Sequence, residues 1–106
     1  MVKIVDFLHR KDGYSHDEFV ERWRGEHGEL AQELPGLQYY STSVPTDPEK
    51  AAYDGVLELG FEDMEALGAA FESEVGQEVQ ADAAEFIDVD AGPRMIVEEH
   101  VHVDKE

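Results

Sequence analysis

A histidine and an aspartate interrupt two apolar helical stripes, and these residue types move protons in enzymes. His27 lies four residues after Trp23 and three before Leu30, so it shares the buried face of a predicted helix. Asp82 lies three residues after Val79, on the inward face of a later helical segment. Each needs a buried partner, because an unpaired polar group costs about 1–3 kcal/mol. Two interpretations stay open: structural hydrogen bonds in the core, or acid–base chemistry in which Asp82 orients His27.

Consecutive tyrosines at positions 39 and 40 could supply a phenolic proton donor to the same pocket. Side chains alternate along a strand, so one tyrosine faces the predicted helices and the other faces away. The sequence leaves open which of the two does so, and cross-strand packing is the alternative role for both. The predicted catalytic residues are His27, Asp82 and Tyr39, and the predicted substrate-binding residues are Trp23, Tyr40 and Phe86.

Two further histidines, His100 and His102, share one face of the last predicted strand. Only Glu98 accompanies them there, so we assign no metal site. The sequence has no glycine-rich phosphate loop, no Ser–His–Asp spacing and no dinucleotide fingerprint. We therefore predict that the protein works without a bound cofactor.

Six segments must position these residues, in the order strand, helix, strand, strand, helix, strand. Ser15 and Glu18 form a capping box at the start of the first helix. Pro35 and Gly36 end that helix, and Ser73 restarts the second helical region. The predicted strands cover 2–10, 37–44, 53–61 and 94–103, and the predicted helices cover about 15–33 and 63–85.

This order of elements is that of the ferredoxin-like split βαβ unit, an α+β fold. A chain of 106 residues forms one such domain, residues 1–106. Helices cover only one sheet face in this fold, and the other face here carries Tyr, Val and Ile mixed with Glu and His. An apolar sheet face needs a cover, so we predict a homodimer packed face to face across a two-fold axis. A monomer with a half-polar open face is the alternative.

The composition is strongly acidic, with 26 Asp and Glu against 8 Lys and Arg and a formal net charge of −18. This charge argues against nucleic acid or anionic lipid as a partner, because both require a basic surface. The acids are spread along the whole chain, which favours a salt-adapted surface of halophilic type over an acidic tail. No apolar stretch approaches the roughly 18 residues of a membrane helix, and no signal peptide or cysteine is present. We therefore expect a soluble cytoplasmic protein.

Several segments, in this order and spacing, resemble the EthD family, which is named for a protein needed in ethyl tert-butyl ether degradation. They are the opening MVKIVDFLHRKDGYSHDEFVERWRGEHGEL, the LPGLQYY run, the YDGVLELGF strand, the SEVGQEVQADAAEFID segment and the closing VEEHV. The resemblance covers nearly the whole chain and implies a dimeric α+β barrel. It places the family's helix histidine on His27, its tyrosine on Tyr39 or Tyr40, and its acid on Asp82.

Similar barrels include cofactor-free isomerases of muconolactone type, polyketide cyclases and dehydratases, and small monooxygenases. Near relatives are often called EthD reductases, a name that would make them oxidoreductases. The favoured hypothesis is an enzyme in which His27 transfers a proton on a small, apolar, oxygenated substrate of a degradation or secondary-metabolite pathway. A non-catalytic binding protein, or an accessory protein to a separate oxygenase, is the alternative. A haem-handling barrel is a third hypothesis, since related barrels bind haem and histidine can ligate its iron.

Overall fold

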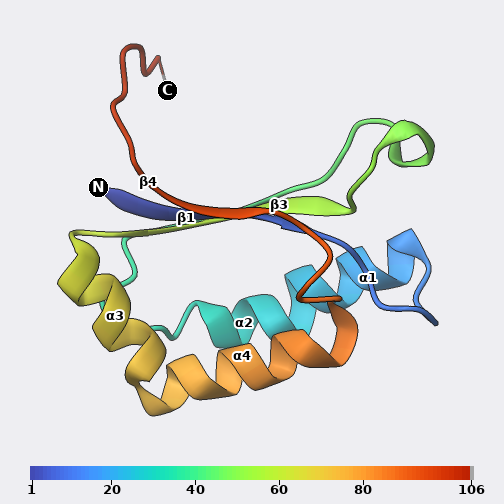
Figure 1. Ribbon diagram of the computed structural model, residues 1–106, viewed down its shortest axis with the longest axis horizontal. Coiled ribbons are helices and arrows are strands. Elements are labelled where there is room, and N and C mark those ends of the chain that lie inside the picture. Colours follow the sequence, from blue (N-terminus) through green and yellow to red (C-terminus); the bar gives the residue numbers. More distant parts are fainter. Residues whose placement is uncertain (106) are drawn as a thin grey trace.

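The computed structural model describes residues 1–105 and has an antiparallel sheet with the long helices packed on one face (Figure 1). The strands are β1 (Val2–Leu8), β2 (Tyr39–Ser43), β3 (Gly55–Phe61) and β4 (Arg94–Glu98). The helices are α1 (His16–Arg22), the π-helical turn η1 (Trp23–His27), α2 (Gly28–Ala31), the 3₁₀ turn η2 (Pro48–Lys50), α3 (Met64–Glu72) and α4 (Glu74–Phe86). The predicted β-α-β-β-α-β order is therefore confirmed.

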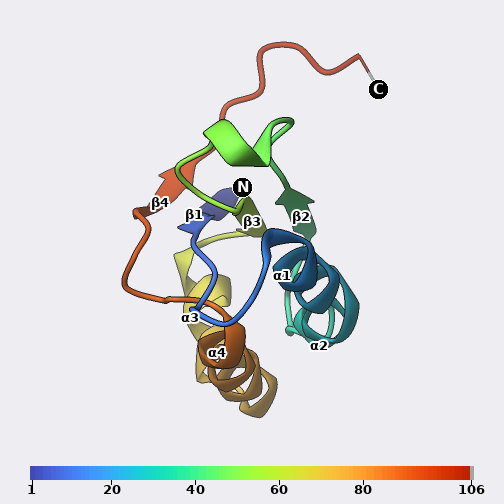
Figure 2. The ribbon, with the colours of Figure 1, turned by 90° about the vertical axis from the view of Figure 1, so that its right-hand side faces the viewer.

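The sheet has the strand order β2-β3-β1-β4, which is the ferredoxin-like arrangement. All four strands are shorter than predicted, most of all the last one, which ends at Glu98 rather than at position 103. The reason lies in the ladder: Glu98 pairs with Val2, the first residue of β1, so the partner strand stops there. The following residues leave the sheet and extend away from it (Figures 1 and 2).

The first helical region is not one regular helix, as the sequence predicted, but α1, η1 and α2 joined end to end. The predicted capping box is present: Ser15 Oγ accepts from the Glu18 backbone N–H, and the Glu18 carboxylate accepts from the Ser15 N–H. The regular helix is interrupted at Gly25, whose dihedral angles are φ −87° and ψ −108°. A π-helical turn of this kind is often found at functional sites, and here its last residue is His27.

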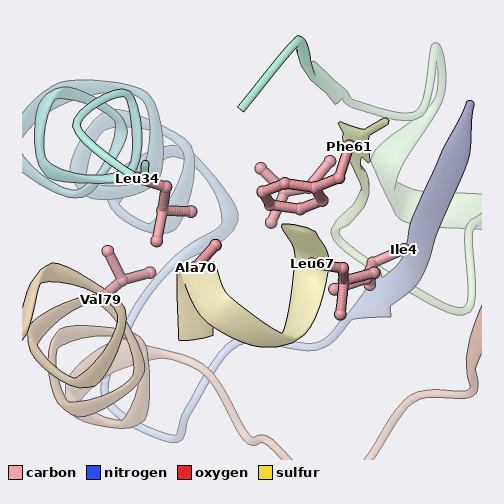
Figure 3. Close-up of a cluster of buried hydrophobic side chains, with 7 residues drawn as sticks. Ile4, Leu34, Phe61, Leu67, Ala70 and Val79 are labelled. Carbon is pink, nitrogen blue, oxygen red and sulfur yellow. The ribbon is translucent and has the colours of Figure 1, made fainter. Parts of the chain in front are cut away.

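The core fills the space between the sheet and the helix layer. One cluster combines Ile4, Leu59 and Phe61 of the sheet with apolar side chains of the helices and the loop after α2, and Figure 3 shows most of its members. A second cluster lies toward the other end of the sheet and contains Leu8, Phe19, Trp23, Phe86 and Ile87. No helix within residues 1–105 is long and apolar enough to cross a membrane.

The opposite sheet face, here called the open face, has no α-helix against it, and only the η2 loop and the C-terminal segment extend on that side (Figure 1). The alternation and register place Val5, Phe7, Tyr39, Val56, Met95 and Val97 on it. Lys3 is buried among them, with its Nζ 2.5 Å from a Glu99 oxygen, 3.6 Å from a Glu58 oxygen and 3.8 Å from the centre of the Tyr39 ring. The open face is therefore apolar around a small charged network.

Candidate functional site

The structure brings together the histidine and the aspartate of the two interrupted stripes. His27 Nδ1, at the end of η1, lies 2.7 Å from Asp82 Oδ2 on α4. Arg22, the last residue of α1, binds the same carboxylate through both of its terminal nitrogens, at 2.9 Å and 2.5 Å. His27 is 4% exposed, so its ring is held inside the protein with its position set by Asp82.

The electrostatics of this triad favour a neutral imidazole. The hydrogen bond from Arg22, followed by the one from His27, holds the pKa of Asp82 below its ordinary value despite partial burial. Burial lowers the pKa of His27, and this effect exceeds the opposing attraction of Asp82, whose charge Arg22 already balances. A carboxylate only accepts hydrogen bonds, so Nδ1 carries the proton and Nε2 carries a free lone pair. An imidazole in this state can accept a proton at Nε2.

His27 lines a cavity of about 290 Å³ between the sheet and the helices. Most of its wall is apolar and comes from β1, β3, the helices α2, α3 and α4, and the residues just after α4. The apolar lining residues include Leu8, Ala31, Leu57, Leu59, Phe71, Val79, Ala83 and Ile87. The polar lining residues are His27, Tyr40, Asp6, Gln80, Asp88 and Arg94. Such a wall suits an apolar molecule that carries a few polar groups.

Of the two tyrosines, the structure places Tyr40 in this cavity and Tyr39 on the open face. The Tyr40 hydroxyl is buried and has no hydrogen-bond partner in the described part of the chain. A Cβ added to Gly28, the residue after His27, would lie 3.6 Å from that hydroxyl, so Tyr40 reaches the helical segment that carries His27. Burial raises the pKa of Tyr40, which keeps its proton in place for donation. Tyr40, and not Tyr39, is therefore the tyrosine that lines the cavity together with His27.

The predicted substrate-binding residues Trp23 and Phe86 are fully buried and do not line the cavity. The Phe86 ring meets the His27 ring edge-on at 5.2 Å between centroids, and the Arg22 guanidinium lies 4.8 Å from the Phe86 centroid. Trp23 packs on Phe19, with ring centroids 5.5 Å apart. Phe86 therefore packs against the His27 ring, and Trp23 belongs to the aromatic cluster next to it.

Four of the polar lining residues were not identified from the sequence: Asp6, Gln80, Asp88 and Arg94. A signal for Asp6 was present, because a charged residue between Ile4 and Leu8 interrupts the inward-facing alternation of the first strand. The rings of His100 and His102 lie 4.5 Å apart at their centroids. Within residues 1–105, however, no group of three His, Asp or Glu side chains is placed to hold a metal ion.

The fold and this cavity define a ferredoxin-like α+β domain with a histidine-containing pocket between its sheet and its helices. The EthD domain, as a family model, matches residues 11–90. The chain therefore belongs to the EthD family.

Solved structures show the same fold at low sequence identity. An ethyl tert-butyl ether degradation (EthD) family protein from Bacillus halodurans C-125 is 24% identical, with a TM-score of 0.79 over 94% of this chain and 99% of that one. HapK from Hahella chejuensis is 15% identical, with a TM-score of 0.74 over 100% of this chain and 98% of that one. A dimeric ferredoxin-like protein of unknown function from Thermobifida fusca is 16% identical, with a TM-score of 0.67 over 91% of this chain and 86% of that one. No curated protein matches the sequence.

Proposed function

We propose that the protein is a cofactor-free enzyme that transfers a proton on a small, apolar, oxygenated substrate. The observation that carries this proposal is the 2.7 Å contact between His27 Nδ1 and Asp82, in a histidine that also lines the cavity. The contact fixes the tautomer and turns Nε2 into the basic atom. A neutral imidazole in a partly dry pocket is a suitable general base near neutral pH.

Tyr40 supplies the second part of the mechanism. When His27 removes a proton from a carbon next to a carbonyl group, negative charge develops on the carbonyl oxygen. The buried Tyr40 hydroxyl has no hydrogen-bond partner among residues 1–105 and can donate a hydrogen bond to that oxygen. The apolar wall then selects a ring compound such as a lactone, a polyketide-like ring or a quinone.

The first prediction concerns proton removal from a simple ketone. The probe is 3-cyclohexen-1-one in D₂O, with hydrogen–deuterium exchange at the carbon between the carbonyl and the double bond followed by NMR. The wild-type protein should accelerate this exchange, and His27→Gln should lose about 10²–10⁴-fold of the acceleration, the usual contribution of a general base. Stability should change little, because Asp82 keeps both of its Arg22 hydrogen bonds.

His16→Gln is the matched control. His16 also pairs with an aspartate, at 2.8 Å from Asp54, but it does not line the cavity. Its variant should keep the wild-type exchange rate. If His27→Gln exchanges as fast as the wild type while both still bind the ketone, the protein is a binding or accessory protein and not an enzyme of this type.

We also propose that the protein acts as a homodimer, with two open faces packed together. Phe7, Tyr39 and Met95 are 38%, 41% and 65% exposed on or beside that face, and burial of such side chains favours association. Val101 and Val103 are exposed on the C-terminal segment, on the same side. The Thermobifida fusca relative with this fold is described as dimeric, which supports the proposal.

The second prediction is therefore a mass near twice 11.9 kDa by light scattering in molar salt. Met95→Lys should lower that mass toward a single chain, because it buries a charge between the two sheets. Met64→Lys is the control, since Met64 is 53% exposed at the start of α3 on the helix side. A wild-type mass of one chain at micromolar concentration would contradict the proposal.

The acidic composition also bears on the partners of the protein and on the salt concentration in which it works. With a formal net charge of −18, we infer that neither nucleic acid nor an anionic membrane is a partner. We infer further that the protein works in a cytoplasm of high ionic strength, where self-repulsion is screened.

A further inference from the structure

Asp6 places a carboxyl group on the core-facing side of the central strand. Along β1 it alternates with Ile4 and Leu8, which are 2% and 4% exposed. Across the ladder it pairs with Arg94 at the start of the edge strand. Asp6 lines the same cavity as His27, but from the sheet rather than from the helix layer. A carboxylate at such a position costs stability that an apolar residue would not.

The carboxyl of Asp6 has little support from the protein. Its nearest cation is Arg94, whose Nε lies 3.6 Å from Oδ2, beyond hydrogen-bonding distance. Asp54 and Asp82, by contrast, each accept three hydrogen bonds. Nothing in the described structure makes Asp6 part of a structural network of that kind. Its oxygens are available to a molecule in the cavity.

The cavity shifts the proton affinities of Asp6 and His27 in opposite directions. Burial raises the pKa of Asp6, with the charge of Arg94 opposing it. Burial lowers the pKa of His27, although Asp82 opposes that shift. The remaining charged groups on the wall are Asp88 and Arg94. A carboxyl that holds its proton more firmly, in the same cavity as an imidazole that holds its proton less firmly, is the combination of an acid and a base.

We propose that Asp6 is a second proton-transfer residue of this cavity, which returns a proton from the sheet side to a substrate that His27 deprotonates from the helix side. This inference rests on the proposed function and narrows its substrate class. The substrate must lose a proton at one atom and gain one at another, as a β,γ-unsaturated ketone or lactone does when its double bond moves into conjugation.

The proton and electron changes balance within the residues named. His27 Nε2 takes the proton between the carbonyl and the double bond, and the electron pair of that C–H bond spreads into a dienolate. Tyr40 donates a hydrogen bond to the dienolate oxygen. The Asp6 carboxyl proton then joins the far alkene carbon, where the dienolate electrons form the new C–H bond and the carbonyl is restored. His27 releases its proton to water and Asp6 takes one back, so the product is an isomer.

The third prediction separates the two proton transfers with one probe. On 3-cyclohexen-1-one in D₂O, Asp6→Asn should keep proton exchange next to the carbonyl within about twofold, while conversion to the conjugated ketone falls by about tenfold or more. Deuterium at the far alkene carbon of the product should fall with conversion. The alkaline limb of the pH profile of conversion, which reports loss of the Asp6 proton, should disappear in Asp6→Asn. Asp90→Asn, an exposed carboxylate outside the cavity wall, is the matched control and should behave as wild type.

The possible results are distinguishable. Unchanged conversion in Asp6→Asn overturns the role of Asp6 and leaves His27 untouched. Loss of exchange together with conversion also overturns it, because Asp6 would then support the base instead of supplying the second proton. If the wild type and His27→Gln exchange the ketone equally, the proposed function fails first, and the inference about Asp6 fails with it.

Discussion

Replacing Asp54 by alanine is expected to lower the free energy of unfolding by about 2–4 kcal/mol, because it removes a buried acceptor of three hydrogen bonds. Asp54 is 4% exposed, just before β3. Its carboxylate accepts from the Arg10 backbone N–H at 2.9 Å, the Arg10 guanidinium at 2.6 Å and the His16 ring at 2.8 Å. These bonds tie together the end of β1, the start of α1 and the entry to β3.

The cost follows from what the alanine leaves behind. The Arg10 backbone N–H and the His16 ring lose their acceptor inside the protein, while the Arg10 side chain, 38% exposed, can turn to water. The expected loss in the free energy of unfolding is therefore smaller than the loss for a fully buried charge that is left unpaired. Asp47→Ala is the matched control, since Asp47 is 52% exposed and its Lys50 contact is 3.8 Å long, and it should change stability by less than about 0.5 kcal/mol.

The stability difference between the wild type and Asp54→Ala should depend on pH in a definite direction. Burial alone would raise the pKa of Asp54, but the bonds from Arg10 and His16 outweigh it and hold that pKa below the ordinary 3.8. A carboxyl whose pKa is lowered by folding stabilises the protein at every pH above its pKa in the unfolded chain. This contribution is lost as the pH falls through the pKa of the group in the folded protein. Urea unfolding should thus show the wild type and Asp54→Ala converging as the pH falls below about 4. A constant difference down to that range would show that Asp54 contributes by packing alone.

The spacing of apolar residues was enough to predict which polar residues of the helices face inward. His27 and Asp82 both interrupt a stripe with helical steps, and both line or adjoin the cavity. Their contact was not predictable, because it joins residues 55 apart in the sequence and depends on how α4 packs beside η1. The break at Gly25 was missed for a related reason: a glycine inside a helical stripe carries no signal that distinguishes a π-helical turn from a regular one.

The two tyrosines show the limit of alternation as evidence. Alternation requires that they face opposite ways, but the choice between them depends on register with the neighbouring strand. In the structure Tyr40 pairs with Leu59 and Tyr39 pairs with Gly60. Leu59 faces the helices, so Tyr40 does as well. A slip of one residue would exchange the two tyrosines, and the loop between these strands is too long to fix the register from sequence.

The stability of the protein is expected to rise by about 2 kcal/mol or more between roughly 0.1 M and molar KCl, which for a domain of this size is a gain of about 8–16 °C in Tm. The chain carries 26 acidic residues against 8 basic ones, so even complete pairing of every Lys and Arg would leave most carboxylates without a cation. Their mutual repulsion opposes the compact state. The screening length falls from about 10 Å to about 3 Å over this range, which removes repulsion between all but adjacent charges.

Salt also strengthens apolar burial, so screening must be separated from that effect. The triple variant Glu33→Gln, Glu65→Gln and Glu78→Gln serves this purpose, because all three side chains are exposed and the exchange takes the formal net charge from −18 to −15. If repulsion is the cause, the variant melts at a higher temperature than the wild type in 0.1 M KCl, and its gain from added salt is smaller. Thermal melts followed by circular dichroism measure both quantities. A wild-type Tm that stays flat, or a variant with the same salt response, would show that the acidic surface is not a salt adaptation.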